Sequence, residues 1–415
     1  MAQQLIYKGG ITVGLIVKKF GGSSVANAEK VMNVATIITD EYKAGNSVVV
    51  VVSAQGDTTD DFLEKAAEIN KKPSKREMDV LLSAGEQISM SLLAMAIEKI
   101  GCPVVSLTGW QAGVTTNSVY GMARIKTINT ERIKKELDSN RIVIVAGFQG
   151  INKYDDITTL GRGGSDTSAV ALAAALHADK CEIYTDVDGV YTADPRIVKD
   201  AQKLDDISYD EMLELASLGA NVLHNRSVEL ALKYDVKLEV KSSFERVPGT
   251  IVKEVKNVEK MLVRGVTRDN DVATVSLVGV ENTPGKAFKV FSLLAKGNVN
   301  VDMILQSVGR ENSKDITFSV PLNQLDSAIE LLEENLELVG AQKIDFEKEV
   351  SKVSIVGAGM VSNPGVAAKM FEALYNAQIN IMMISTSEIK VSVIIDKADA
   401  EKAVKAIHDK FFNHE

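Results

Sequence analysis

The sequence predicts a large α/β domain, with a mainly parallel sheet between layers of helices, followed by two smaller α+β domains in tandem. Short β-branched segments alternate with longer amphipathic segments through the first 240 residues, which is typical of a parallel sheet covered by helices. Beyond about Met261 a pattern recurs after roughly eighty residues, which indicates two copies of one small unit. The 415 residues are sufficient for this organisation.

The elements of the first domain follow from its apolar patterning. Val48–Val52 is apolar throughout, as expected for a strand that is buried on both faces. The longer segments are rich in Ala, Leu, Met and Glu and place apolar residues three or four positions apart, which predicts helices. Strands are expected near 14–19, 47–53, 103–107, 141–147, 181–186 and 236–240. Helices are expected over 26–43, 76–99, 166–177 and 208–217.

The two copies in the second half align without ambiguity. Val275–Gly279 recurs as Val353–Gly357, and a Pro-Gly pair follows each of them. Each copy reads as strand, Pro-Gly turn opening a helix, strand, strand, helix and strand, and proline suits the start of a helix because its missing N–H would be unpaired there. We expect domains at 1–250, 261–348 and 349–415, joined through the polar segment 241–260, with 1–12 as a candidate extension.

Composition excludes several classes of function. The 47 Lys+Arg residues are outnumbered by 56 Asp+Glu, and the net charge of −9 does not favour nucleic acid or anionic membrane surfaces as partners. The longest apolar runs are far shorter than the ~20 residues that cross a bilayer. Cys102 and Cys181 lie far apart in apolar contexts, which predicts reduced core residues in a cytoplasmic protein. With four histidines a zinc site is not expected, and any metal would have oxygen ligands.

Two glycine-rich segments lie where a strand gives way to a helix. In Lys19–Ser24 the adjacent glycines allow close approach of a ligand, and amides at a helix start bind anionic oxygens. A tight turn with a solvated lysine is an equally good interpretation of that segment alone. Gly161–Ser168 contains Arg162, which suits a carboxylate, and Asp166, which can orient a lysine or a metal-bound phosphate. Helix capping is the alternative for its polar residues.

Further polar residues follow other expected strands. Thr185–Arg196 and Ser53–Asp60 both stand at the carboxyl end of a strand, where ligands bind in open α/β sheets. The first of them begins like a calcium loop, but Ile197 occupies the position that requires glutamate. Glu86 interrupts an apolar helical run beside Gly85, which favours a close-contact site over a solvated face.

Taken together, and in this order, the motifs resemble the aspartate kinase (aspartokinase) family over nearly the whole chain. The resemblance implies the amino acid kinase fold for the first domain and ferredoxin-like ACT domains for the two copies. It also implies an enzyme that transfers the γ-phosphoryl group of ATP to the β-carboxylate of L-aspartate. The product would be 4-phospho-L-aspartate, in the first step of lysine, threonine and methionine biosynthesis. Mg²⁺ would bridge the phosphates of ATP.

The resemblance assigns roles to individual residues. Lys19 and Asp166 would be catalytic, with Asp166 orienting Lys19. Asn221 stands where the family commonly has a nucleotide-contacting lysine, which puts that contact in question. ATP would be bound by Lys19, Phe20, Gly21, Gly22, Thr185, Asp186, Tyr191, Ala193, Asp194, Pro195 and Arg196. Aspartate would be bound by Ser53, Thr59, Asp60, Glu86, Arg162, Gly163, Gly164 and Ser165.

The ACT domains would bind lysine, threonine or both as feedback inhibitors, and Asp302 would pair with the ammonium group of an effector. The resemblance also implies a homodimer or an assembly with a shorter regulatory subunit through these domains. The effector residues would be Asn282, Thr283, Gly285, Ala287, Asn300, Val301, Asp302, Gln306, Asn380, Ile381, Thr386 and Glu388.

Two other readings remain open from the sequence. The first is a kinase of the same superfamily that acts on a different acceptor, such as glutamate or a nucleotide. The second is a non-catalytic protein that senses amino acids, which Asn221 supports and the presence of Lys19 and Asp166 opposes.

Overall fold

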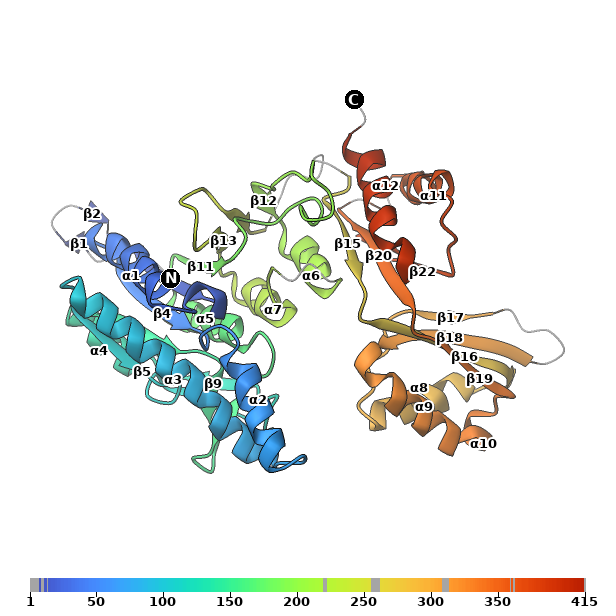
Figure 1. The fold of residues 1–415 in the computed structure, drawn as a ribbon, viewed down its shortest axis with the longest axis horizontal. Helices are drawn as coiled ribbons and strands as arrows, with labels where there is room; N and C mark the ends of the chain where they lie inside the picture. The colour runs from blue at the N-terminus through green and yellow to red at the C-terminus, as the bar shows by residue number, and fades with distance from the viewer. Residues whose placement is uncertain are drawn as a thin grey trace. The chain divides into compact units, whose positions relative to one another are not determined.

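The computed structural model describes residues 7–8, 11–12, 14–218, 222–254, 262–307, 313–358, 360 and 363–413. The chain divides into two compact units (Figure 1). The first unit comprises Met1–Val190, Lys203–Ser217 and Asn221–Lys256, and the second comprises Tyr191–Gln202, Leu218–Ala220 and Asn257–Glu415. Each expected half of the chain therefore forms most of one unit, but Tyr191–Gln202 lies in the second unit although it belongs to the first half of the sequence.

The first unit is built on an eight-stranded sheet in the order β12-β14-β13-β11-β3-β4-β8-β5. The pairs from β13 through β11, β3, β4 and β8 to β5 are parallel, as the apolar patterning predicted. Only the β13–β14 pair of this sheet is antiparallel. The strands are β3 Leu15–Phe20, β4 Ser47–Val52, β5 Val104–Leu107, β8 Ile142–Ala146, β11 Lys180–Thr185, β12 Asp206–Ile207, β13 Leu238–Ser242 and β14 Thr250–Val252.

Helices cover both faces of this sheet. On one face, apolar side chains of α1 and α3 form a core with Phe20 of β3 and the alternate valines of β4. On the other face, α5 packs on β3, β4 and β11. The expected helices are confirmed, whereas α2 begins at Thr58, within the segment Ser53–Asp60 that was expected to be a polar loop. The helices are α1 Ala28–Lys43, α2 Thr58–Ile69, α3 Lys75–Lys99, α4 Glu131–Asp138, α5 Gly164–Leu176, α6 Tyr209–Ser217 and α7 Asn225–Tyr234, with a 3₁₀ turn η1 at Gly22–Ser24.

A small sheet in the order β10-β9-β6-β7 packs beside α3. Its attachment depends on Asp79, a buried residue of α3 whose carboxylate accepts N–H groups of Gly121 and Thr159 and the Thr159 hydroxyl. α3 is long and apolar enough to cross a membrane, a test that core helices also meet, and much of it is buried here. The remaining strands are β6 Val114–Thr116, β7 Ile125–Ile128, β9 Gln149–Ile151 and β10 Ile157–Thr159, with a separate β1 Tyr7–Lys8 and β2 Ile11–Thr12 pair.

The second unit contains two four-stranded antiparallel sheets, one for each copy of the repeat. Their orders are β17-β18-β16-β19 and β15-β20-β22-β21. The strands are β15 Gly265–Asp269, β16 Val272–Glu281, β17 Ile304–Gln306, β18 Ser313–Pro321, β19 Lys343–Glu347, β20 Val350–Val356, β21 Met383–Thr386 and β22 Lys390–Asp396. The helices are α8 Lys286–Lys296, α9 Leu325–Glu334, α10 Leu336–Val339, α11 Val366–Asn376 and α12 Ala400–Phe412, with 3₁₀ turns η2 Leu322–Gln324 and η3 Lys397–Asp399.

Strand β15 lies within the expected domain 261–348 but belongs to the sheet of the expected domain 349–415. β15 precedes the first copy in sequence but pairs with β20, the first strand of the second copy. It occupies the edge position beside β20 that β19 occupies beside β16 in the first copy. The first copy therefore lies, in sequence, between two parts of the second copy's sheet. The division into separate domains at 261–348 and 349–415 stays a prediction.

The segment Tyr191–Gln202 joins the second unit through its apolar side chains. Ala193, Ile197 and Val198 are buried in one core with residues of β20 and α12. The Thr192 hydroxyl lies 2.9 Å from Nε2 of His408, a buried residue of α12, and accepts the N–H of Gln202. Burial lowers the pKa of His408 below its usual value. The segment is thus held at both ends and in its middle.

Candidate active site

Lys19 and Asp166 form the centre of the candidate site. The Lys19 ammonium lies 2.6 Å from Oδ1 of Asp166, and each side chain is 12% exposed. Lys19 stands near the carboxyl end of β3, and Asp166 lies in the first turn of α5, where the helix dipole favours a carboxylate. The two residues are 147 positions apart in sequence, and the packing of α5 on β3 brings them together.

The direction of Lys19 follows from the register of β3. Lys18 is paired with Glu182 of β11, and Lys19 with Ile183. Because side chains alternate across a sheet, a shift by one residue would exchange the faces of the two lysines. Lys18 is almost fully buried and contacts Glu182 and, at 2.9 Å, Glu41. The contacts of Lys18 with Glu182 and Glu41 hold Lys18 on one face of the sheet, so Lys19 lies on the face that α5 covers.

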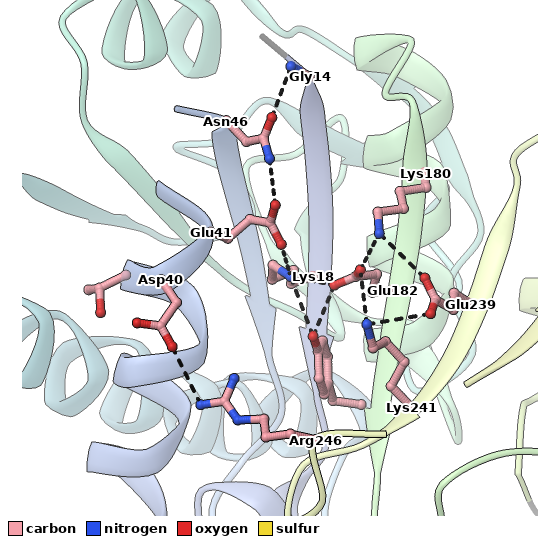
Figure 2. A network of polar contacts seen from close by, with 12 residues as sticks. Gly14, Lys18, Asp40, Glu41, Asn46, Lys180, Glu182, Glu239, Lys241 and Arg246 are labelled. Atoms are coloured by element: carbon pink, nitrogen blue, oxygen red, sulfur yellow. Dashed lines mark hydrogen bonds and ion pairs between the residues drawn. The ribbon is translucent and has the colours of Figure 1, made fainter. Parts of the chain in front are cut away.

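Figure 2 shows that Lys18 and Glu182 belong to a larger network of charges. Glu182 also contacts Lys180 at 2.5 Å and Lys241 at 3.5 Å, and Glu239 contacts both of those lysines. Burial alone would raise the pKa of Glu182, but the surrounding ammonium groups lower it to about 2. Glu182 is therefore a carboxylate throughout the neutral range, and the network stabilises the pairing of β3 with β11.

The glycine turn after β3 lies against the neighbouring strand ends. A Cβ at Gly22 would approach the carbonyl oxygen of Ala54 to 2.6 Å, so only glycine fits there. A Cβ at Gly21 would lie 3.5 Å from the Lys19 ammonium, which places that ammonium beside the turn. Ser24 and Ser243 share a hydrogen bond of 2.9 Å at the same edge of the sheet. The turn thus presents backbone close to a full positive charge, as an anionic ligand requires.

A cavity of about 240 Å³ opens above this turn. It brings together most of the residues predicted to bind aspartate. It also contains Ala54, Gly56 and Gly161, which lie in predicted segments but were given no role, and Phe148, which sequence reasoning did not identify. Asp60 lines a larger neighbouring cavity instead. The lining residues are Lys19, Gly22, Ser53, Ala54, Gly56, Thr59, Glu86, Phe148, Gly161, Arg162, Gly163, Gly164, Ser165 and Asp166.

Glu86 supplies a buried carboxyl group to the cavity. Its Oε1 accepts the N–H of Ala54 at 3.1 Å, whereas Oε2 is buried and has no protein partner within the described residues. Burial raises the pKa of Glu86 to about 7. Gly85 explains how α3 comes this close, since a Cβ there would lie 2.7 Å from that of Ala54. A positively charged ligand group would satisfy Oε2 and favour the ionised carboxylate.

Four residues that line the cavity have left-handed backbone, and two of them, Phe148 and Gly163, are constrained by their neighbours. Phe148 has φ 68°, which is uncommon for a residue with a Cβ, and its N–H donates to the Ser168 hydroxyl at 3.0 Å. Gly163, with φ 67°, precedes α5, and a Cβ there would collide with the His224 ring. Arg162 thus stands on a turn whose course is set by glycine and by the packing of its neighbours. Its guanidinium has no ion pair within the described part of the chain.

The structure divides the residues predicted to bind nucleotide. Thr185 ends β11 and Asp186 follows it in the first unit, where the Thr185 hydroxyl donates to Asp186 at 2.9 Å. Lys19–Gly22 also belong to the first unit, whereas Tyr191 and Ala193–Arg196 belong to the second, where Arg196 pairs with Asp194 at 2.8 Å. Asn221 lies outside the described residues. The nucleotide role of these residues stays a prediction.

The predicted effector residues are mostly exposed turn and edge positions of the two sheets in the second unit. Asp302 is exposed as well, but its Oδ2 lies 2.7 Å from the ammonium of Lys352, a buried residue of β20. Burial opposes ionisation of Asp302, but Lys352 lowers its pKa below the usual value. The carboxylate predicted to meet an effector's ammonium group thus already contacts an ammonium group of the chain itself.

Both halves of the chain are similar to known protein families. Residues 14–242 match the amino acid kinase family, and residues 275–336 and 353–411 match the ACT domain. The aspartokinase of Bacillus sp. strain MGA3 is 53% identical over 400 residues, covering 96% of this chain and 97% of that protein. The chain therefore belongs to the aspartokinase family within the amino acid kinases, and the resemblance of its motifs is confirmed.

Solved structures confirm the fold class. E. coli aspartokinase III in complex with aspartate and ADP, in its R-state, is 26% identical with a TM-score of 0.81, over 96% of this chain and 100% of that one. The same enzyme in complex with lysine and aspartate, in its T-state, has a TM-score of 0.74 at 26% identity, over 96% and 99% of the two chains. The fold is thus shared with an enzyme seen in two states.

Proposed function

We propose that this chain transfers the γ-phosphoryl group of ATP to the β-carboxylate of L-aspartate, giving 4-phospho-L-aspartate and ADP. The observation that carries the proposal is the Lys19–Asp166 pair at the end of a cavity that also contains Glu86 and Arg162. The family and the aspartate and ADP complex of E. coli aspartokinase III support it.

The chemistry requires little more than placement and charge. A carboxylate of aspartate is already ionised near neutral pH, so no strong general base is required. One of its oxygens forms a bond to the γ-phosphorus while the bond from that phosphorus to the bridging oxygen of ADP breaks. Lys19 stabilises the negative charge on the transferring group. Asp166 orients the Lys19 ammonium through the 2.6 Å contact.

The cavity also accounts for the choice of acceptor. L-Aspartate has an ammonium group between two carboxylates, and the cavity offers a matching set of opposite charges. Glu86 would hold the ammonium through Oε2, which has no protein partner among the described residues. Arg162 would hold the α-carboxylate with two parallel hydrogen bonds. The β-carboxylate is then left to face Lys19 and the γ-phosphorus.

The nucleotide would place its phosphates at the turn formed by Gly21 and Gly22, beside Lys19. Among the described residues no cluster of three or more Asp, Glu, His or Cys side chains could hold a metal ion. That observation fits Mg²⁺ bound chiefly through phosphate oxygens and water, as is common in phosphoryl transfer. Mg²⁺ would neutralise part of the charge of ATP when bound. The two buried, unpaired cysteines are compatible with a cytoplasmic enzyme.

The ACT domains would make the enzyme sensitive to lysine, threonine or both. E. coli aspartokinase III has been observed in complex with lysine, which supports lysine as one effector. Two copies that differ in sequence would offer two kinds of site. The edge strands β17 and β21 carry exposed apolar side chains, including Ile304 and Ile384, and suit association with a second chain or a shorter regulatory subunit. Effector binding would then be coupled to catalysis.

The test is a release assay for ADP with a panel of acceptors. L-Aspartate should give turnover, whereas L-glutamate and nucleoside monophosphates should give little. Turnover with another acceptor alone would favour a different kinase of the superfamily, and no turnover with any acceptor would favour a sensor. Lysine and threonine together should inhibit more than either alone.

A further inference from the structure

A second and larger cavity adjoins the proposed aspartate site. Its volume is about 610 Å³, within the range of small-molecule sites. The two cavities share Thr59, Phe148, Gly161 and Arg162 as lining residues. The others that line the larger cavity are Asp60, Leu63, Lys75, Met78, Asp79, Leu82, Tyr120, Gly121, Met122 and Thr159.

The walls of this cavity are fixed by buried polar contacts. Asp79 is 1% exposed and accepts hydrogen bonds from both Gly121 and Thr159, which also line the cavity. The Tyr120 hydroxyl donates to Asp156 at 2.7 Å. α3 and the small sheet are thereby held together around the cavity. The space is a formed feature of the first unit.

The floor of the cavity is apolar. Met78 and Leu82 lie four residues apart on α3 and therefore face the same side of the helix. Leu63 of α2 and Met122 join them although they are 44% and 75% exposed. Neighbouring apolar side chains left exposed around a cavity indicate a binding surface for an apolar group.

The rim carries unbalanced charge. Asp60, Lys75 and Arg162 are exposed lining residues, and none of these three side chains has an ion pair or a hydrogen bond within the described ranges. An α-amino acid with an apolar side chain has an ammonium group, a carboxylate and an apolar part. Asp60 suits the ammonium group, Lys75 and Arg162 suit the carboxylate, and the apolar floor suits the side chain. We propose that the larger cavity is an accessory site for such an apolar α-amino acid.

In this site the ligand's carboxylate would lie between Lys75 and Arg162, its ammonium would meet Asp60, and its side chain would cover Met78 and Leu82. L-Aspartate fits the floor poorly because its second carboxylate would be desolvated there without a partner. Since Arg162 borders both cavities, occupancy should compete for Arg162 and raise the KM for aspartate. The proposal does not require phosphoryl transfer, because binding is measured directly.

The experiment is calorimetry on the full chain with L-alanine, L-leucine and L-phenylalanine. L-Leucine should bind about tenfold or more tightly than L-alanine, since it buries additional apolar carbons. Absence of binding by leucine and phenylalanine, in a preparation that turns over aspartate, would overturn the proposal and leave the kinase function intact. Equal affinity for alanine and leucine would also overturn it.

Three variants locate the bound amino acid. Lys75→Glu should weaken leucine binding at least fivefold, whereas Lys71→Glu, an equal charge change on an exposed residue that does not line the cavity, should leave it unchanged. Glu86→Gln should also leave it unchanged. Binding that survives Lys75→Glu would place the ligand elsewhere, as in the ACT domains. Binding lost in Glu86→Gln but not in Lys75→Glu would place it in the aspartate pocket. Either result contradicts the proposal.

Discussion

Two adjacent lysines on β3 occupy opposite faces of one sheet and have different surroundings. Lys18 is 1% exposed and contacts Glu41, Glu182 and Tyr184. Lys19 lines a cavity, and its ammonium contacts Asp166. The comparison teaches that residue type and strand position do not separate a structural lysine from one that we propose to be catalytic. What separates them is which side of the sheet leaves an ammonium group accessible to a ligand.

The largest effect should come from removing the accessible lysine. Lys19→Met should lower kcat by about 10³-fold, because the negative charge of the transferring group loses its positive partner. The melting temperature should fall only modestly, since Asp166 lines a cavity that water can enter. The kcat from ADP release and the thermal melt of the same preparation measure this. A rate near that of the unmodified protein would remove Lys19 from the mechanism.

The matched change on the other face should affect stability. Lys18→Met leaves Glu182 buried without its closest partner and should lower the free energy of unfolding by about 3–5 kcal/mol. Removing both charges, in Lys18→Met/Glu182→Met, should cost less because no unpaired charge remains. Chemical denaturation measures both variants. If the single variant is as stable as the unmodified protein, the network in Figure 2 does not stabilise the β3–β11 pairing.

Asp166→Asn should lower kcat by about 10²-fold, a smaller effect than loss of Lys19 itself, because the ammonium remains but is no longer oriented by a carboxylate. The KM for aspartate should change less than kcat does. Steady-state kinetics over both substrates separate the two quantities. The double variant with Lys19→Met should be no slower than Lys19→Met alone, and additive losses would show that Asp166 acts independently of Lys19.

The raised pKa of Glu86 predicts how the KM for aspartate depends on pH. Burial raises its pKa from 4.5 to about 7, so in the free enzyme the carboxyl group is protonated below that range. The KM for aspartate should therefore rise as pH falls through about 7, and Glu86→Gln should have a high KM that no longer follows this pH change. A pH dependence of KM that is the same in both proteins would exclude Glu86 as the ammonium partner.

The same pKa shift predicts an effect on stability. Because the folded state holds the proton more tightly than the unfolded chain, the stabilisation is complete below pH 4.5 and is lost as pH rises to about 7. Glu86→Gln should gain stability relative to the unmodified protein across that window, by up to about 3 kcal/mol, as each pKa unit corresponds to about 1.4 kcal/mol. Denaturation at pH 5 and pH 8 measures the difference.

Much of the site could be predicted from the sequence because it depends on charged residues and glycines beside strand ends. Lys19, Asp166, Glu86 and Arg162 were predicted individually, and the fold brings them to one cavity. Phe148 was not predicted because its contribution depends on a left-handed backbone that its residue type disfavours.

The partner of β15 and the burial of Tyr191–Gln202 in the second unit could not be predicted from the sequence. The sequence did not indicate that β15 pairs with the second copy, since strand partners are not encoded in local periodicity. Ala193, Ile197 and Val198 bury Tyr191–Gln202 in the second unit, but three apolar residues in a turn-rich segment carry no signal of their partner.

The most direct test is the identity of the product formed with ATP, L-aspartate and hydroxylamine, which traps an acyl phosphate as its hydroxamate. In the proposed arrangement Arg162 holds the α-carboxylate and the β-carboxylate faces Lys19, so the unmodified protein should yield the β-hydroxamate, as identified by NMR. A product with the hydroxamate on the α-carboxyl group, or no hydroxamate at all, would contradict the proposed function.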